Sequence, residues 1–294
     1  SIENLSFIQS SIAMLDVFSV TLMLAAFYAF LKDRWYLSGV LIGFSALAKL
    51  TGILALPVIC IYWLATSRKS WLKLGFTVMA APTTYLVVLP LLLFIIWGKF
   101  LNPVTETMTM LRLNSYSTFS VIDSSMLSRP WEWLLNYKII TYYPEPHYIA
   151  AISSTIWALA VPAMLYMGYR ALKRNRAAAF SFSWFAGCYL LWIPTSMLTD
   201  RTSYIFYFYP VIGAVSMAIA FLLGDISARS ARYSSRVFNF LAQWAIPVYI
   251  LLHISVFVFL SPVQYWSKFL IGAGLYVLAR IAMAEKDACI YLEE

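Results

Sequence analysis

The sequence predicts an all-α membrane protein, a polytopic bundle of about nine transmembrane helices in which residues 1–294 form one integral membrane domain. Hydrophobic residues make up 62% of the chain and charged residues only 12%, whereas a soluble domain carries about 25% charged residues. Apolar runs long enough to cross a hydrocarbon layer of about 30 Å recur along nearly the whole chain. Because these runs are long and do not alternate with polar residues, helices are expected and not a barrel. A soluble globule is excluded.

Eight apolar runs follow one another, separated by short polar links and by one long segment at 99–148. The runs cover residues 8–31, 36–64, 74–98, 149–169, 177–198, 204–223, 237–260 and 267–284. The second run is too long for one untilted helix, and it contains Ala-Lys-Leu-Thr-Gly at 48–52. It is therefore either one tilted helix or two short helices that turn near Gly52.

The distribution of basic residues favours the two short helices. If run 36–64 is a hairpin, fourteen of the 21 basic residues lie on one side of the membrane, the asymmetry typical of cytoplasmic loops. These are Lys32, Arg34, Arg68, Lys69, Lys73, Arg170, Lys173, Arg174, Arg176, Arg229, Arg232, Arg236, Arg280 and Lys286. We therefore expect nine spans, an outside N-terminus, a cytoplasmic C-terminus and an extracytoplasmic loop at 99–148. The same orientation accounts for most of the net charge of +8, so no nucleic-acid partner is expected.

Ionisable residues gather at the outer side of this topology. Asp16 lies in the outer half of the first span, Lys49 at the apex of the hairpin, and Arg201 in a short outer link that leads into Tyr204 and Tyr207. An ionisable residue at membrane depth costs about 2.5–3.5 kcal/mol and usually marks function. Cations at this boundary suit a lipid phosphate. The alternative is that Lys49 snorkels, that Asp16 caps a helix or pairs with Lys49, and that Arg201 is an interfacial anchor.

The outer segment contains a second candidate feature. Pro130 suits the first position of a helix, and apolar residues then recur at helical spacing at Trp131, Leu134, Leu135, Ile139 and Tyr142. This pattern predicts an amphipathic helix that lies in the membrane interface. For the tryptophans an ordinary aromatic belt is the competing interpretation. His147 fits a hydrogen-bonded surface residue better than a catalytic base.

Four stretches in this order resemble the dolichyl-phosphate-mannose protein O-mannosyltransferase family, and the resemblance covers most of 8–225. They are Ser-Ile-Ala-Met-Leu-Asp-Val-Phe at 11–18, Gly-Phe-Ser-Ala-Leu-Ala-Lys-Leu-Thr-Gly at 43–52, Ser-Arg-Pro-Trp-Glu-Trp at 128–133 and Arg-Thr-Ser-Tyr-Ile-Phe-Tyr-Phe-Tyr-Pro at 201–210. No large outer domain follows the third apolar run, which favours an archaeal or bacterial relative.

The resemblance implies a membrane glycosyltransferase of the C-type fold. Such an enzyme transfers mannose or a related hexose from a polyprenyl (dolichyl) phosphate to Ser or Thr hydroxyls of an acceptor protein, outside the cytoplasm. By the same resemblance Lys49, Arg201, Tyr204 and Tyr207 would hold the donor phosphate and lipid, and Asp16 would contact the sugar or a helix start. The acceptor side would be lined by Arg129, Trp131, Glu132, Trp133 and His147.

The sequence departs from the family at the catalytic carboxylates, which in the family lie in the first outer loop, upstream of the matching region. The catalytic residues therefore stay unassigned, and the chain is expected to be an N-terminally truncated form that is inactive alone. Two other classes stay open. A polytopic transporter would usually show self-similar halves, which this chain lacks, and a non-catalytic scaffold subunit would also lack the carboxylate loop. Cys60, Cys188 and Cys289 have no metal-like spacing, so neither a zinc site nor a disulfide framework is expected, and no residue is assigned as a metal ligand.

Overall fold

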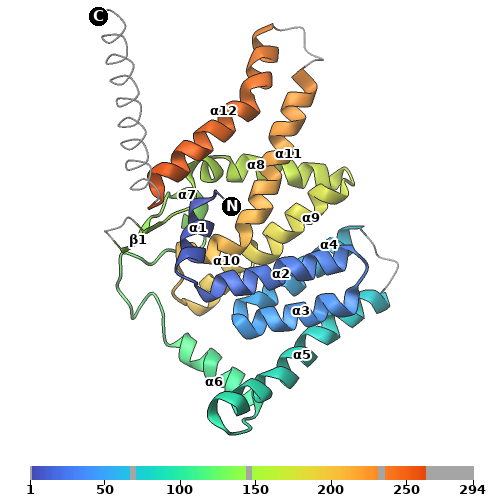
Figure 1. Ribbon diagram of the computed structural model, residues 1–294, viewed down its shortest axis with the longest axis vertical. Coiled ribbons are helices and arrows are strands. Elements are labelled where there is room, and N and C mark those ends of the chain that lie inside the picture. Colours follow the sequence, from blue (N-terminus) through green and yellow to red (C-terminus); the bar gives the residue numbers. More distant parts are fainter. Residues whose placement is uncertain (1, 67–70, 144–147, 231–235, 263–294) are drawn as a thin grey trace, which may run out of the picture.

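The structure is a computed structural model that describes residues 2–66, 71–143, 148–230 and 236–262. Helices dominate it, with one small two-stranded sheet at one end of the bundle (Figure 1). Within these described ranges, three helical segments are long and apolar enough to cross a membrane: Trp71–Trp97, Arg176–Thr199 and Ile205–Ala228. A bent pair of helices at the N-terminal end would make a fourth. A helical membrane protein is thus confirmed, whereas the nine spans and their orientation stay predictions.

The first apolar run is broken into two helices. The helices α1 (Asn4–Ser11) and α2 (Leu15–Leu31) meet at an angle of 116°. Between them Ala13 takes a left-handed backbone conformation, with φ of 49°. The Glu3 side chain caps α1 by accepting hydrogen bonds from the backbone N–H groups of Leu5 and Ser6. The cap thus fixes the start of α1, and the turn that contains Ala13 separates α1 from α2.

The second apolar run contains the break that the hairpin interpretation requires. The helix α3 (Trp35–Ala48) ends at Lys49, whose backbone is extended, and a 3₁₀ turn, η1 (Leu50–Leu54), leads into α4 (Ala55–Thr66). The turn is tight, because a Cβ on Gly52 would lie 2.5 Å from the carbonyl oxygen of Ser45. Ser45 in turn donates a hydrogen bond of 2.7 Å to the Ser19 carbonyl and so joins α3 to α2.

The long segment at 99–148 differs from the prediction. It follows α5 (Trp71–Trp97) and contains α6 (Pro103–Ser115), a single helical turn α7 (Glu132–Leu135), and strand β1 (Ile140–Tyr143), which pairs antiparallel with β2 (Tyr148–Ala150). The predicted amphipathic helix from Pro130 to Tyr142 is therefore wrong beyond its first turn. Its tryptophan Trp133 is fully buried, and the chain beyond Asn136 is extended.

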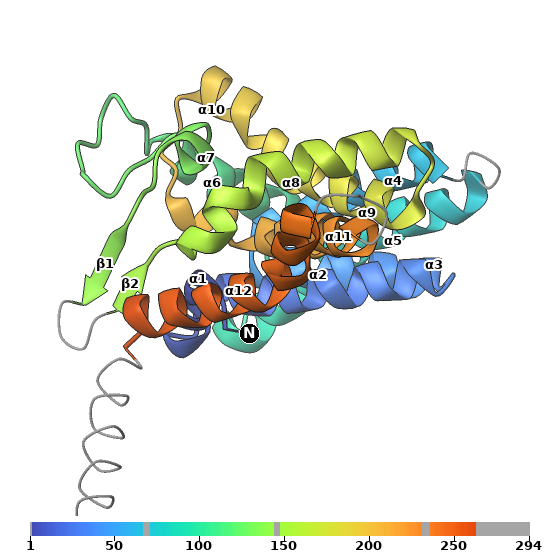
Figure 2. The same cartoon turned by 90° about the horizontal axis from the view of Figure 1, so that it is seen from above.

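The remaining elements complete the bundle. They are α8 (Ser154–Leu172), α9 (Arg176–Phe185), a π-helical turn η2 (Ala186–Leu190), α10 (Trp192–Thr199), a 3₁₀ segment η3 (Ile205–Val211), α11 (Ile212–Ser230) and α12 (Arg236–Leu260). The predicted span at 267–284 lies outside the described residues. Figures 1 and 2 place the sheet and α7 at one end of the bundle, and the α2–α3 and α8–α9 turns at the opposite end.

Candidate functional site

An ion pair between Asp16 and Lys49 forms the centre of the candidate site. Asp16 lies in the first turn of α2, and Lys49 follows directly after α3. The Lys49 Nζ atom is 2.7 Å from each carboxylate oxygen of Asp16. The Asp16 side chain is only 3% exposed and that of Lys49 is 21% exposed. Of the alternatives left open by the sequence, the structure has the one in which Asp16 pairs with Lys49.

Aromatic rings from η3 lie beside this pair. The Lys49 Nζ atom is 5.5 Å from the ring centroid of Phe206 and 5.1 Å from that of Tyr207. Tyr204 stacks on Phe206 at 5.0 Å, and Tyr207 stacks on Trp192 at the same distance. A cation within about 6 Å of an aromatic ring is attracted to it, so these contacts hold the ammonium group next to the rings.

Arg201 reaches the same group of residues from the link between α10 and η3. Its guanidinium neighbours the phenol of Tyr207, and its Nη2 atom lies 3.4 Å from Oδ1 of Asn114 in α6. Asp16, Lys49 and Arg201 therefore converge through Tyr207, although Lys49 and Arg201 are far apart in the sequence. Both cations retain donors: an ammonium has three N–H groups and a guanidinium five.

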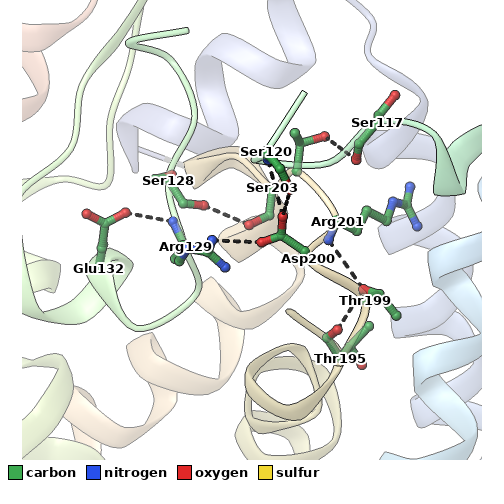
Figure 3. Close-up of polar contacts among 11 residues, drawn as sticks. Ser117, Ser120, Ser128, Arg129, Glu132, Thr195, Thr199, Asp200, Arg201 and Ser203 are labelled. Atoms are coloured by element: carbon green, nitrogen blue, oxygen red, sulfur yellow. Dashed lines mark hydrogen bonds and ion pairs between the residues drawn. The ribbon is translucent and has the colours of Figure 1, made fainter. Parts of the chain in front are cut away.

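The residue before Arg201 holds the outer segment against the bundle. Asp200 ends α10 with a left-handed φ of 49°, and its carboxylate accepts hydrogen bonds from the Ser120 hydroxyl and backbone N–H. The Nη2 atom of Arg129 donates to the other carboxylate oxygen at 2.8 Å. Figure 3 shows these contacts, with the Arg201 side chain directed away from Asp200. We call this cluster of Ser120, Arg129 and Asp200 the outer latch.

Two further hydrogen bonds fix the chain next to the outer latch, and the carboxylate of the latch has a lowered pKa. The Ser128 backbone N–H donates to the Ser203 carbonyl at 2.9 Å, and the Ser203 hydroxyl donates back to the Ser128 carbonyl at 2.7 Å. The hydrogen bonds from Ser120 and Arg129 hold the pKa of Asp200 below its ordinary value. The carboxylate is thus charged at neutral pH, and the segment around 117–129 is fastened beside Arg201.

The residues expected on the acceptor side have different surroundings. Glu132 is used locally, because its Oε2 atom accepts from the Arg129 backbone N–H at 2.7 Å and its Oε1 atom lies 3.4 Å from Lys138. Trp131 is half-buried, with Arg129 5.5 Å from its ring. Trp133 packs in the core against Tyr189, Trp192 and Phe208. His147 lies outside the described residues.

Sequence reasoning missed two contributors to the site, Ser120 and Phe206. Ser120 sits in a polar stretch without any pattern, so nothing in the sequence pairs it with Asp200. Phe206 lies in the aromatic run 204–209. The run predicts a cluster of aromatic rings, but it does not indicate which ring lies next to Lys49. Asp200 was visible as a charged neighbour of Arg201. In the described ranges no group of three His, Cys, Asp or Glu side chains is placed to hold a metal ion.

Comparison with known proteins gives two findings. A sequence model of glycosyltransferase family 87 matches residues 9–194, more than half of the chain. The polyprenol-phosphate-mannose–protein mannosyltransferases of two Mycobacterium tuberculosis strains, CDC 1551 and H37Rv, are each 27% identical over 151 residues, which is 46% of this chain.

These aligned residues make up 28% of each mannosyltransferase, so the chain spans little more than a quarter of the length of the curated relatives that it matches. No solved structure matches the chain. The family match includes Asp16 and Lys49 and ends shortly before Asp200 and Arg201. On the strength of that match, the chain belongs to glycosyltransferase family 87.

Proposed function

We propose that this protein transfers mannose or a related hexose from a polyprenyl phosphate to Ser or Thr hydroxyls of an acceptor protein, on the extracytoplasmic side of the membrane. The mannosyltransferase relatives act on a polyprenol-phosphate-mannose donor and a protein acceptor, as their names state. The single observation that carries the proposal is the convergence of Lys49 and Arg201 beside Tyr207 of the η3 aromatic cluster.

The chemistry of the transfer requires cations at this position. The acceptor hydroxyl oxygen forms a bond to the anomeric carbon and gives its proton to a general base, which is unassigned in this chain, while the bond from that carbon to the phosphate oxygen breaks. The departing polyprenyl phosphate takes the electron pair and gains negative charge. Preorganised cationic donors stabilise such a leaving group because they need not reorient as the charge develops. Lys49 and Arg201 are the candidates for this role.

Asp16 is assigned a positioning role. Its carboxylate accepts two of the three N–H donors of Lys49, so one donor is left for the phosphate. A free lysine side chain would sample many rotamers, whereas this one is fixed at both the carboxylate and the aromatic rings. The Arg201 guanidinium contacts the Tyr207 phenol and makes a hydrogen bond of 3.4 Å to Asn114, so the remainder of its five N–H donors are available to the donor lipid.

A binding experiment tests the phosphate site without depending on turnover. The protein is purified into phosphatidylcholine nanodiscs and titrated with polyprenyl phosphate. A hydrogen bond to a charged group contributes about 1.5–3 kcal/mol, so Lys49→Gln and Arg201→Gln should each weaken binding roughly ten- to a hundredfold. Lys99→Gln and Arg112→Gln are matched controls, because they remove the same charge from exposed positions after α5 and in α6.

A second experiment concerns the reaction. Full-length protein is incubated with labelled polyprenyl-phosphate-mannose and a Ser/Thr-rich acceptor peptide. Label in the peptide that depends on Lys49 and Arg201 supports the transferase. Polyprenyl phosphate binding without any transfer would favour a non-catalytic subunit, and movement of the intact donor across vesicle membranes would favour a transporter.

A further inference from the structure

The end of the bundle opposite the Asp16–Lys49 pair contains two cavities that the proposed reaction does not use. The smaller, of about 210 Å³, is lined by residues of α2–α5 and α9, among them Asp33, Thr66, Lys73 and Arg176. The larger, of about 670 Å³, shares Thr66 and Arg176 and adds Arg174. Both figures show the α2–α3 and α8–α9 turns together at this end (Figures 1 and 2).

The charge that lines these cavities is mostly positive. Among the described residues, the lining of the two cavities includes three cations, Lys73, Arg174 and Arg176, and one carboxylate, Asp33. Lys73 lies 3.9 Å above the Trp35 ring. Within the described part of the chain, neither Arg174 nor Arg176 forms an ion pair or a hydrogen bond through its guanidinium.

The backbone adds to this positive potential. Arg176 is the first residue of α9, and Arg174 precedes it with a left-handed φ of 62°. The N-terminus of a helix carries a partial positive charge, so cations there are repelled and an anion is attracted. Asn175 caps the Ala178 N–H and leaves other first-turn donors of the helix unused by side chains. A bound anion would remove the repulsion between the two arginines and the helix end.

The remaining lining of the larger cavity is apolar. Leu64, Ala65, Ala171 and Ala179 form one part of its wall. Leu72 and Leu172, next in sequence to the lining residues Lys73 and Ala171, are 79% and 85% exposed. Basic groups next to exposed aliphatic side chains match an anionic lipid, whose phosphate meets cations while its acyl chains meet apolar surface.

From this arrangement we infer that the cavity between α4, α8 and α9 is a binding site for a phosphate group, supplied by an anionic phospholipid. Arg174 and Arg176 bind the phosphate, Lys73 contributes a third positive charge, and the aliphatic wall contacts the first part of the acyl chains. The site lies at the opposite end of the bundle from the donor site, so it binds a structural or regulatory lipid and not the sugar donor.

The test measures retained lipid and thermal stability of the purified protein in nanodiscs of phosphatidylcholine, with or without one-fifth phosphatidylglycerol. Each basic residue near an anionic surface contributes about a fivefold change in binding, so Arg174→Gln with Arg176→Gln should lower phosphatidylglycerol binding about 25-fold. Phosphatidylglycerol should raise the melting temperature of the parent protein and not that of this double variant.

The matched control removes two charges at the same end of the bundle without touching the cavities. Lys32→Gln with Arg34→Gln alters exposed residues of the α2–α3 turn, neither of which lines a cavity. This control should retain parental binding, as should Arg174→Lys with Arg176→Lys, which keeps the charge. Equal losses in the Gln double variant and in the control would overturn the inference, because general surface charge would then explain the binding.

A third arm identifies the source of the phosphate. Inorganic phosphate is added to the protein in pure phosphatidylcholine. Little or no stabilisation at millimolar phosphate supports the lipid, because the apolar wall then contributes to binding. Stabilisation equal to that given by phosphatidylglycerol would overturn the lipid assignment in favour of a free phosphate. Since none of these measurements uses turnover, their outcome is independent of the proposed glycosyl transfer.

Discussion

The two residues of the Asp16–Lys49 ion pair are expected to differ in how much stability the protein loses when each is substituted. Asp16 is 3% exposed and accepts two bonds of 2.7 Å, while Lys49 is 21% exposed. Lys49→Met leaves a buried carboxylate without its cation, which costs about 3–5 kcal/mol. Asp16→Asn leaves an ammonium whose flexible stem can reach water, so its cost should be nearer 1–2 kcal/mol. The lysine variant is therefore expected to be the less stable one.

The assay is unfolding in a detergent-to-SDS titration, followed by tryptophan fluorescence, for both single variants and the double variant. The double variant should be more stable than Lys49→Met alone, because it contains no uncompensated buried charge. Lys99→Met, at an exposed position, is the control and should be close to the parent. Equal costs for the two single variants, or strictly additive costs in the double variant, would refute the reasoning.

Three more predictions concern packing and the outer latch. Trp133→Ala should lower stability by about 3–5 kcal/mol in the same titration and Trp131→Ala by much less, since only Trp133 is fully buried. Gly52→Ala should destabilise by about 1–3 kcal/mol, because its Cβ would meet the Ser45 backbone, whereas Gly75→Ala, with open space around it, should be neutral or slightly stabilising. Equal effects within either pair would contradict these assignments. The lowered pKa of Asp200 means that the outer latch is intact above the ordinary pKa of an aspartate and opens as the pH falls through the lower pKa that Asp200 has in the folded protein, measured as a loss of protection from hydrogen exchange at 117–129 after correction for the intrinsic exchange rate. The same region should exchange faster at neutral pH in Asp200→Asn, but not in Asp123→Asn, which changes an exposed acid in the same segment; unchanged exchange in Asp200→Asn would count against the latch.

The sequence was informative about the fold where hydrophobicity alone decides the structure. Long apolar runs became helices, and the polar insertion at 48–52 became the break between α3 and α4. The bend at Ala13 was not predictable, because it depends on a left-handed backbone conformation at a residue that is not glycine. Helical spacing also misled at 130–142, where pairing of Ile140 with Ala150 overrides the local pattern.

The candidate site was predictable in part for the same reason. Charges at membrane depth are costly, so Asp16, Lys49 and Arg201 stood out, and the structure brings them to one end of the bundle. The outer latch could not be foreseen, because Ser120 and Asp200 are 80 residues apart and serine carries no signal of its own. Hydrogen bonds between ordinary polar side chains depend on the tertiary structure and produce no periodic pattern in the sequence.

The charge balance of the site favours the departing lipid over the intact donor in the proposed reaction. Asp16 and Lys49 neutralise each other, so Arg201 supplies one net positive charge. A sugar linked to a polyprenyl phosphate is a phosphodiester with one negative charge, whereas the released phosphate monoester carries about 1.5–2 negative charges at neutral pH. Attraction to Lys49 and Arg201 therefore grows as the glycosidic bond breaks. Interactions that strengthen along the reaction lower its barrier, whereas interactions equal in both states only tighten binding. A site with one net charge, held next to a lysine with one unused donor, meets this requirement better than a strongly basic pocket, which would hold the donor as tightly as the product.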